Sequence, residues 1–211
     1  MKILEEISAA LQQGKAKIVA ELVTKALDNG TSAKDILEVG LLAGMSVIGE
    51  KFKKNEVYVP EVLIAARAMN AGAALLKSAL ADEGVESSGT VVLGTVKGDL
   101  HDIGKNLVKM MMEGKGLKVV DIGVDVPPEK FVETAKSENA QIIACSALLT
   151  TTMSEMKNVI EAAKTAGIRD KLKIMVGGAP ITNEFCKSIG ADLYAPDAAT
   201  AADEAVAVCS A

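Results

Sequence analysis

The chain has 211 residues, of which 49% are hydrophobic, so it can form one ordinary domain or two small ones with real cores. A formal charge of -5 and 2% aromatic residues argue against nucleic acid as a partner, because phosphate binding needs a concentrated basic surface and base stacking needs rings. No run reaches the roughly 18 apolar residues of a membrane span, and three scattered cysteines fit a reducing compartment, so we expect a cytoplasmic protein.

Residues 1 to 83 carry apolar residues at helical spacing. The first helix is expected to end at Gly14 and the second at Asn29-Gly30. Ser32 offers an N-cap for a third helix from Ala33 to about Lys53, and a fourth runs from near Pro60 to Glu83. These four helices predict a small bundle.

The segment Gly84 to Gly89 has no apolar periodicity and is expected to be a linker, which divides the chain into domains 1–88 and 89–211. After it, short apolar runs alternate with helical stretches, as in repeated βα units on a parallel sheet. The expected strands are Thr90 to Thr95, Lys118 to Asp121, Gln141 to Ser146, Lys173 to Val176 and Leu193 to Ala195. This pattern predicts a flavodoxin-like (Rossmann-like) α/β domain, whose ligands lie beyond the carboxyl ends of the strands.

Three expected strand ends carry distinctive loops. These are Lys97-Gly98-Asp99-Leu100-His101-Asp102-Ile103-Gly104, Ser146-Ala147-Leu148-Leu149-Thr150-Thr151-Thr152, and Gly177-Gly178-Ala179. The first holds the only histidine of the chain, and a helix is expected to open near Lys105. A metal-binding histidine commonly donates its second ring N–H to a carboxylate, and Asp99 is suitably spaced.

Each loop also has an ordinary interpretation. His101 could be a surface histidine in a turn, Gly177-Gly178 could be only a turn, and the hydroxyl run could cap a helix before Met153. The joint occurrence of all three at neighbouring strand ends favours a binding site.

The combined pattern Asp99-x-His101-x-x-Gly104, Ser146-x-Leu148 and Gly177-Gly178 resembles the signature of cobalamin-binding domains. Residues 1 to 83 resemble the helical cap that precedes this module in methionine synthase and in small corrinoid proteins of methyltransferase systems. The resemblance covers essentially the whole chain. It is greatest to the stand-alone corrinoid proteins that work with methylamine, betaine, methanol or methoxyaromatic methyltransferases.

The resemblance implies that His101 is the lower axial ligand of cobalt and that Asp99 and Thr152 form a proton relay with it. Thr152 stands where methionine synthase has a serine, and Tyr58 stands where a phenylalanine covers the upper corrin face. The implied cofactor contacts are Tyr58, Gly98, Asp99, Leu100, His101, Asp102, Ile103, Gly104, Ser146, Leu148, Thr150, Thr152, Gly177, Gly178 and Ala198.

The resemblance also implies a role as a non-autonomous methyl carrier, in which the corrinoid cobalt alternates between Co(I) and methyl-Co(III). The implied partners are a substrate:corrinoid methyltransferase, an acceptor methyltransferase of the tetrahydrofolate or coenzyme M type, and a reductive activation protein. The linker would then be the hinge that lets the cap move.

Three other functions are compatible with parts of the pattern. A small subunit of an adenosylcobalamin radical mutase shares the three loops but usually lacks such a helical cap. A corrinoid-sensing regulator would need a basic recognition helix, which residues 1 to 83 do not suggest. A cofactor-free flavodoxin-like binding module would need no histidine at the strand end.

Overall fold

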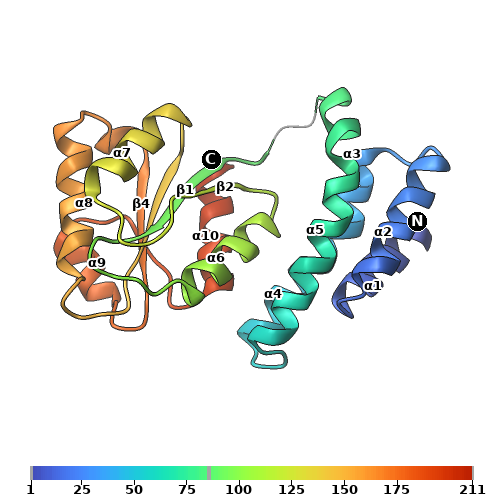
Figure 1. The fold of residues 1–211 in the computed structure, drawn as a ribbon, viewed down its shortest axis with the longest axis horizontal. Helices are drawn as coiled ribbons and strands as arrows, with labels where there is room; N and C mark the ends of the chain where they lie inside the picture. The colour runs from blue at the N-terminus through green and yellow to red at the C-terminus, as the bar shows by residue number, and fades with distance from the viewer. Residues whose placement is uncertain (1, 85–86, 211) are drawn as a thin grey trace. The chain divides into compact units, whose positions relative to one another are not determined.

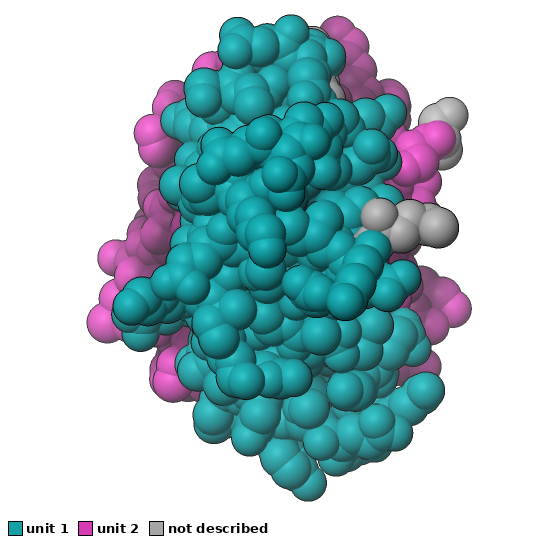
Figure 2. All heavy atoms as spheres, turned by 90° about the vertical axis from the view of Figure 1, so that its right-hand side faces the viewer, with its two compact units in different colours: residues 1–87, 114–116 teal, residues 88–113, 117–211 magenta. Residues whose placement is uncertain are grey.

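The computed structural model describes residues 2–84 and 87–210 and divides into two compact units (Figure 2). The first comprises residues 1–87 with 114–116, and the second comprises residues 88–113 with 117–211. Val85 and Glu86 of the expected linker lie outside the described residues.

The first unit is built from helices that bury one apolar face each (Figure 1). Its elements are α1 (Lys2–Gln12), α2 (Ala16–Asp28), α3 (Ala33–Asp35), η1 (Ile36–Leu42), α4 (Ala43–Lys53) and α5 (Val59–Asp82). The helix α5 packs along α2, and α1 packs against α2, η1 and α4. Its largest fully buried side chains are Ile7, Leu11, Ile36, Leu41, Met45, Ile48 and Leu76.

The expected third helix differs from the prediction in its hydrogen bonding. It runs from Ala33 to Lys53, but η1 in its middle is a π-helix and not an α-helix. At its start Ser32 Oγ accepts from Asp35 N at 3.0 Å, and the Glu83 carboxylate accepts from Ala33 N at 2.7 Å. The end of α5 therefore caps the third helix, a contact between residues far apart in the sequence.

The helix α5 is the one described helix that is long and apolar enough to cross a membrane, over Val59–Leu80. Length and composition are weak evidence, since core helices pass the same test. Val62, Ala65, Met69 and Leu76 of this stretch are buried in the bundle, whereas Leu63, Ile64 and Leu75 are exposed. Packing within the bundle therefore accounts for one face of this helix.

The second unit confirms the predicted five-stranded parallel sheet, with strand order β2-β1-β3-β4-β5. Its strands are β1 (Thr90–Thr95), β2 (Lys118–Asp121), β3 (Ile142–Ser146), β4 (Lys173–Gly177) and β5 (Leu193–Tyr194). The intervening helices are α6 (Ile103–Glu113), α7 (Pro128–Ser137), α8 (Ser154–Thr165), η2 (Arg169–Lys171), α9 (Asn183–Ile189) and α10 (Ala198–Cys209). In Figure 1, α7 and α8 cover one face of the sheet, and α6 and α10 cover the other.

Strand register brings the three distinctive loops together. In the parallel ladders Thr95 pairs with Ser146, and Ser146 pairs with Gly177. The chain thus leaves β1, β3 and β4 at one level of the sheet edge. Neighbouring parallel strands end on the same side, so the residues that follow them share one rim.

Candidate functional site

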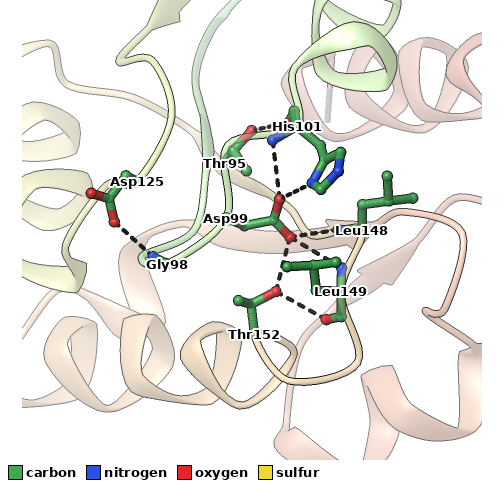
Figure 3. Close-up of polar contacts among 8 residues, drawn as sticks. All are labelled: Thr95, Gly98, Asp99, His101, Asp125, Leu148, Leu149 and Thr152. Carbon is green, nitrogen blue, oxygen red and sulfur yellow. Dashed lines mark hydrogen bonds and ion pairs between the residues drawn. The ribbon is translucent and has the colours of Figure 1, made fainter.

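The loop after β1 begins with a tight turn (Figure 3). Asp99 N donates to Val96 O at 3.1 Å, and Gly98 has a φ of 80°, which favours glycine at this position of the turn. The Thr95 hydroxyl, fully buried, donates to His101 O at 2.9 Å. Local hydrogen bonds therefore fix the path of the backbone between strand and histidine.

The Asp99 carboxylate is the centre of the site and is fully buried. Its Oδ1 lies 2.7 Å from His101 Nδ1 and accepts His101 N at 3.1 Å. Its Oδ2 accepts Leu148 N at 2.8 Å, Leu149 N at 3.1 Å and Thr152 Oγ1 at 2.9 Å. One carboxylate therefore ties the loop after β1 to the loop after β3 (Figure 3).

These contacts decide the ionisation of Asp99. Burial alone would raise the pKa of its carboxyl, but the hydrogen bonds from His101, Leu148 and Leu149 favour the charged form. Their combined effect holds the pKa of Asp99 well below its ordinary value. The site consequently contains a desolvated negative charge beside the imidazole.

The contact with Asp99 also orients the imidazole of His101. A carboxylate only accepts hydrogen bonds, so Nδ1 carries the hydrogen and the lone pair lies on Nε2. The His101 side chain is 50% exposed. The ring can therefore offer Nε2 to a metal, in the arrangement common to metal-binding histidines.

Four apolar side chains are exposed in the loops on either side of His101. Leu100 and Ile103 are 71% and 77% exposed, and Leu148 and Leu149 are exposed as well. A Cβ on Gly104 would meet no atom within 4 Å. A flat, largely apolar group that brings most of its own metal ligands fits this surface and the single imidazole.

No group of three or more His, Cys, Asp or Glu residues that could hold a bare metal ion occurs among residues 2–84 and 87–210. His101 is the one imidazole of its loop, and the nearby exposed side chains are Leu100, Asp102 and Ile103. The donor set fits a macrocyclic metal complex better than a metal ion bound by protein ligands alone.

The Gly177-Gly178 turn is required by the protein chain itself. Gly178 has a φ of 132°, and a Cβ there would lie 1.9 Å from Ala147 O. A Cβ on Gly177 would meet only Ala195 O at 3.4 Å. The second glycine therefore lets the loop after β4 pass directly against the loop after β3.

The structure brings Asp99, His101, Leu148 and Thr152 into one hydrogen-bonded network, and Gly98 and Leu100 lie in the same loop. Of the remaining predicted contacts, Ser146 ends β3 and Thr150 is exposed in the loop after β3, between Leu149 and Thr152. Ile103 and Gly104 begin α6, and Gly177 and Gly178 stand at the end of β4. Ala198 is buried at the start of α10, and Tyr58 is 64% exposed in the first unit. Asp102 accepts from Asn106 Nδ2 at 3.1 Å.

Three participants were missed by sequence reasoning. Thr95 was assigned only to a strand, and Leu149 contributes a backbone N–H that no residue pattern identifies. Asp125 accepts from Gly98 N at 2.7 Å, from the loop after β2. A Gly-x-Asp sequence after a strand signals a turn but does not reveal which loop it meets. The helix after His101 also begins earlier than expected, at Ile103.

The sheet topology and the aspartate-bound histidine at its rim define a Rossmann-like class of cofactor-binding protein. Residues 89–206 and residues 3–77 match two family models, each described as a B12 binding domain. The chain is 45% identical to the dimethylamine corrinoid protein of Methanosarcina barkeri over 97% of this chain and 96% of that one. It belongs to the family of B12-binding corrinoid proteins of methyltransferase systems.

Two further comparisons agree. The trimethylamine corrinoid protein 1 of Methanosarcina acetivorans is 44% identical, over 93% of this chain and 92% of that protein. Among solved structures, the methanol:cobalamin methyltransferase complex MtaBC from Methanosarcina barkeri matches with a TM-score of 0.89 at 30% identity. That match covers 99% of this chain and 80% of the other.

Proposed function

We propose that this chain is a methyl carrier that holds a corrinoid at the sheet rim with His101 Nε2 bound to cobalt. The observation that carries the proposal is the 2.7 Å contact between Asp99 Oδ1 and His101 Nδ1, which directs the ring's lone pair away from the buried carboxylate. When bound, the corrinoid supplies a cobalt centre that can accept a methyl group from one partner and yield it to another.

The protein's part in this cycle is to control one proton. His101 would hold the group through Nε2 while the hydrogen on Nδ1 is shared with Asp99. A free Nε2 could instead take a proton from solvent, which would make the ring a cation beside the carboxylate. Thr152 Oγ1 has both Asp99 Oδ2 and Leu149 O at 2.9 Å, but its single hydrogen serves one at a time. Thr152 can therefore strengthen or release its bond to Asp99 as the charge on the ring changes.

The remaining loop residues are proposed to receive the rest of the cofactor. Leu100, Ile103 and Gly104 would face the corrin, and Thr150 would donate a hydrogen bond near it. Residues 1–88, with Tyr58, are proposed as the cap domain, and residues 89–211 as the cofactor-binding domain. The proposed contacts of the nucleotide tail are Ser146, Leu148, Gly177, Gly178 and Ala198.

The partners follow from the same assignment. We propose a substrate:corrinoid methyltransferase as donor, a methyltransferase with a folate or thiol acceptor, and a reductive activation protein, all in the cytoplasm. The named relatives, which serve dimethylamine and trimethylamine systems, support methylamines as the first donors to test. They favour this carrier role over the radical mutase alternative.

The test begins with uptake of the cofactor. Folded protein incubated with excess hydroxocobalamin under reducing conditions should retain cobalt and colour through gel filtration, and the same holoprotein should transfer a methyl group from a methylamine with its methyltransferase. A folded protein that retains no pigment would overturn the proposal. Retention without transfer from any methylated donor would overturn the carrier role.

Gly104 offers a matched probe of the proposed corrin face. Since a Cβ there meets nothing within 4 Å, Gly104→Val should leave the apoprotein folded and reduce corrinoid retention by about tenfold or more through steric exclusion. Gly104→Ala, which adds the Cβ alone in the same open space, should reduce retention less than the valine. Unchanged retention in Gly104→Val would place the corrin elsewhere.

A further inference from the structure

Asp125, in the loop between β2 and α7, holds the backbone on both sides of Asp99. Its Oδ1 accepts from Gly98 N at 2.7 Å (Figure 3). Its own backbone N–H donates to Asp99 O at 2.9 Å. One residue therefore brackets the Cα atom that carries the buried carboxylate. Asp125 belongs neither to the Asp99-x-His101-x-x-Gly104 motif nor to the loop after β3.

The bond to Gly98 N lies at an exposed turn. Gly98 is the third residue of this turn, and its N–H takes no part in the turn's own hydrogen bond from Asp99 N to Val96 O. Here a carboxylate oxygen meets it at a short distance typical of charge-assisted hydrogen bonds. The Gly98 turn is thus fixed by a second loop as well as by its own Val96–Asp99 bond.

Backbone hydrogen bonds also fix the path of the loop between β2 and α7, which carries Asp125. Thr95 N donates to Gly123 O at 3.0 Å, and Val126 N donates to Thr95 O at 3.0 Å, so the loop continues alongside the end of β1. Between these contacts Asp125 adopts a φ of 53°, in the left-handed region that aspartate and asparagine tolerate best. The backbone places its side chain over the turn.

We propose that Asp125 is a positioning residue, which holds the Gly98–Asp99 backbone so that the Asp99 carboxylate meets Nδ1 of His101. The proposal rests on the proposed function for its importance to cobalt ligation, but the geometry it concerns is present without the cofactor. If Asp99 moves away, Nδ1 loses its acceptor and the hydrogen can pass to Nε2. The lone pair would then lie on the nitrogen that faces the protein.

The test uses the apoprotein, labelled with ¹⁵N at histidine. Because His101 is the only histidine, its two ring nitrogens give unambiguous signals, whose shifts report which nitrogen carries the hydrogen. In alkaline buffer the wild type should show the Nδ1–H tautomer, because the Asp99 carboxylate accepts from Nδ1. Asp125→Gly, which tolerates the backbone conformation but lacks the acceptor, should show a mixture of tautomers.

Two variants separate positioning from general structural damage. Asp125→Asn keeps an oxygen acceptor and the left-handed preference, so it should restore the wild-type ring signals. Asn139→Gly changes another left-handed residue, with a φ of 50°, in a loop outside the network, and should also leave the signals unchanged. If Asp125→Gly does not fold, Asp125→Ala provides the same loss of acceptor.

Corrinoid retention supplies the second readout. Asp125→Gly should bind hydroxocobalamin more weakly than wild type, because the ring then presents a free Nε2 for only part of the time. The loss should be about twofold for an even mixture of tautomers, and Asp125→Asn should recover most of the affinity. Wild-type ring signals in both the glycine and alanine variants would overturn the proposal. Failure of the wild type to bind corrinoid would contradict the proposed function and leave the ring-nitrogen result intact.

Discussion

The loops after β1 and β4 lie at the same edge of the sheet but are held in different ways. In the first, the buried Asp99 side chain collects donors from its own loop and from the loop after β3. In the second, Gly178 contributes no side chain, and what matters is that its backbone can approach Ala147 O. One loop is specified by what its residues donate and accept, and the other by the space they leave empty.

Because the two loops are held differently, substitutions in them should affect stability differently. A side-chain network can be weakened one bond at a time, because each donor can be removed while the backbone stays in place. A close backbone approach cannot be weakened gradually, because every residue other than glycine has a Cβ, and any Cβ at Gly178 must displace the neighbouring loop. Substitutions in the loop after β1 should therefore have graded effects on stability, and substitution of Gly178 in the loop after β4 should have one large effect.

The largest effect is expected at Gly178. Gly178→Ala places a Cβ 1.9 Å from Ala147 O and imposes a positive φ on alanine, and these two penalties together should lower the free energy of unfolding by about 4 kcal/mol. Urea denaturation of the apoprotein measures the loss. The adjacent Gly177→Ala, whose Cβ meets Ala195 O at 3.4 Å, should cost about 1 kcal/mol or less. Equal costs for the two variants would remove the distinction between the loops.

Asp99→Asn should have the second-largest effect. The asparagine amide would turn an N–H toward groups that now donate to a carboxylate, among them Leu148 N and Thr152 Oγ1. With buried donors left unsatisfied, we expect a loss of about 3 kcal/mol in the free energy of unfolding. Thermal or urea unfolding of the apoprotein checks it, and a change below 1 kcal/mol would mean that the network contributes little. Asp102→Asn, at an exposed carboxylate beside His101, is the matched control.

The same carboxylate predicts a pH dependence. Because folding lowers the pKa of Asp99 from its ordinary value of 3.8, its ionised form stabilises the native state above that value, and this stabilisation is lost as pH falls toward the lower native pKa. The stability difference between wild type and Asp99→Asn should therefore shrink as the pH falls below about 4. A difference that grows in acid would contradict the sign of the shift.

The smallest effect is expected at Thr152. Thr152→Val keeps the shape but removes the hydroxyl that donates to Asp99 Oδ2, which should cost about 1 kcal/mol in unfolding free energy. Thr152→Ser keeps the hydroxyl and should retain the bond to Asp99. Comparison of the two by urea denaturation isolates the hydroxyl. A serine variant less stable than the valine variant would assign the role of Thr152 to packing.

The strands were predictable because each is a short apolar run with polar or glycine residues at its ends, as for Thr90–Thr95 and Lys173–Gly177. The π-helical segment Ile36–Leu42 was not predictable. Its hydrogen bonds span five residues instead of four, and this change hardly alters the spacing of the apolar residues. Gly40 lies in this segment, where a Cβ would come 3.2 Å from Ile7 Cγ2. Close packing of helices, which the sequence does not record, accompanies the irregularity.

The candidate site divides in a similar way. Asp99 and His101 are two residues apart, so their contact could be inferred from spacing alone. Asp125 comes from another loop, and only the parallel alignment of chain beside β1 brings it to Gly98. The Leu148 and Leu149 donors are backbone groups, which every residue but proline possesses. Contacts of this kind depend on the completed fold.

The central claim is that His101 provides the axial nitrogen of the bound cobalt. Protein labelled with ¹⁵N only at histidine, reconstituted with unlabelled cobalamin and reduced to Co(II), can be examined by electron paramagnetic resonance. If His101 binds cobalt, each line should be split into a doublet by ¹⁵N instead of the triplet given by ¹⁴N. A triplet that persists in the labelled protein would show that the nitrogen belongs to the cofactor's own base and would contradict the account.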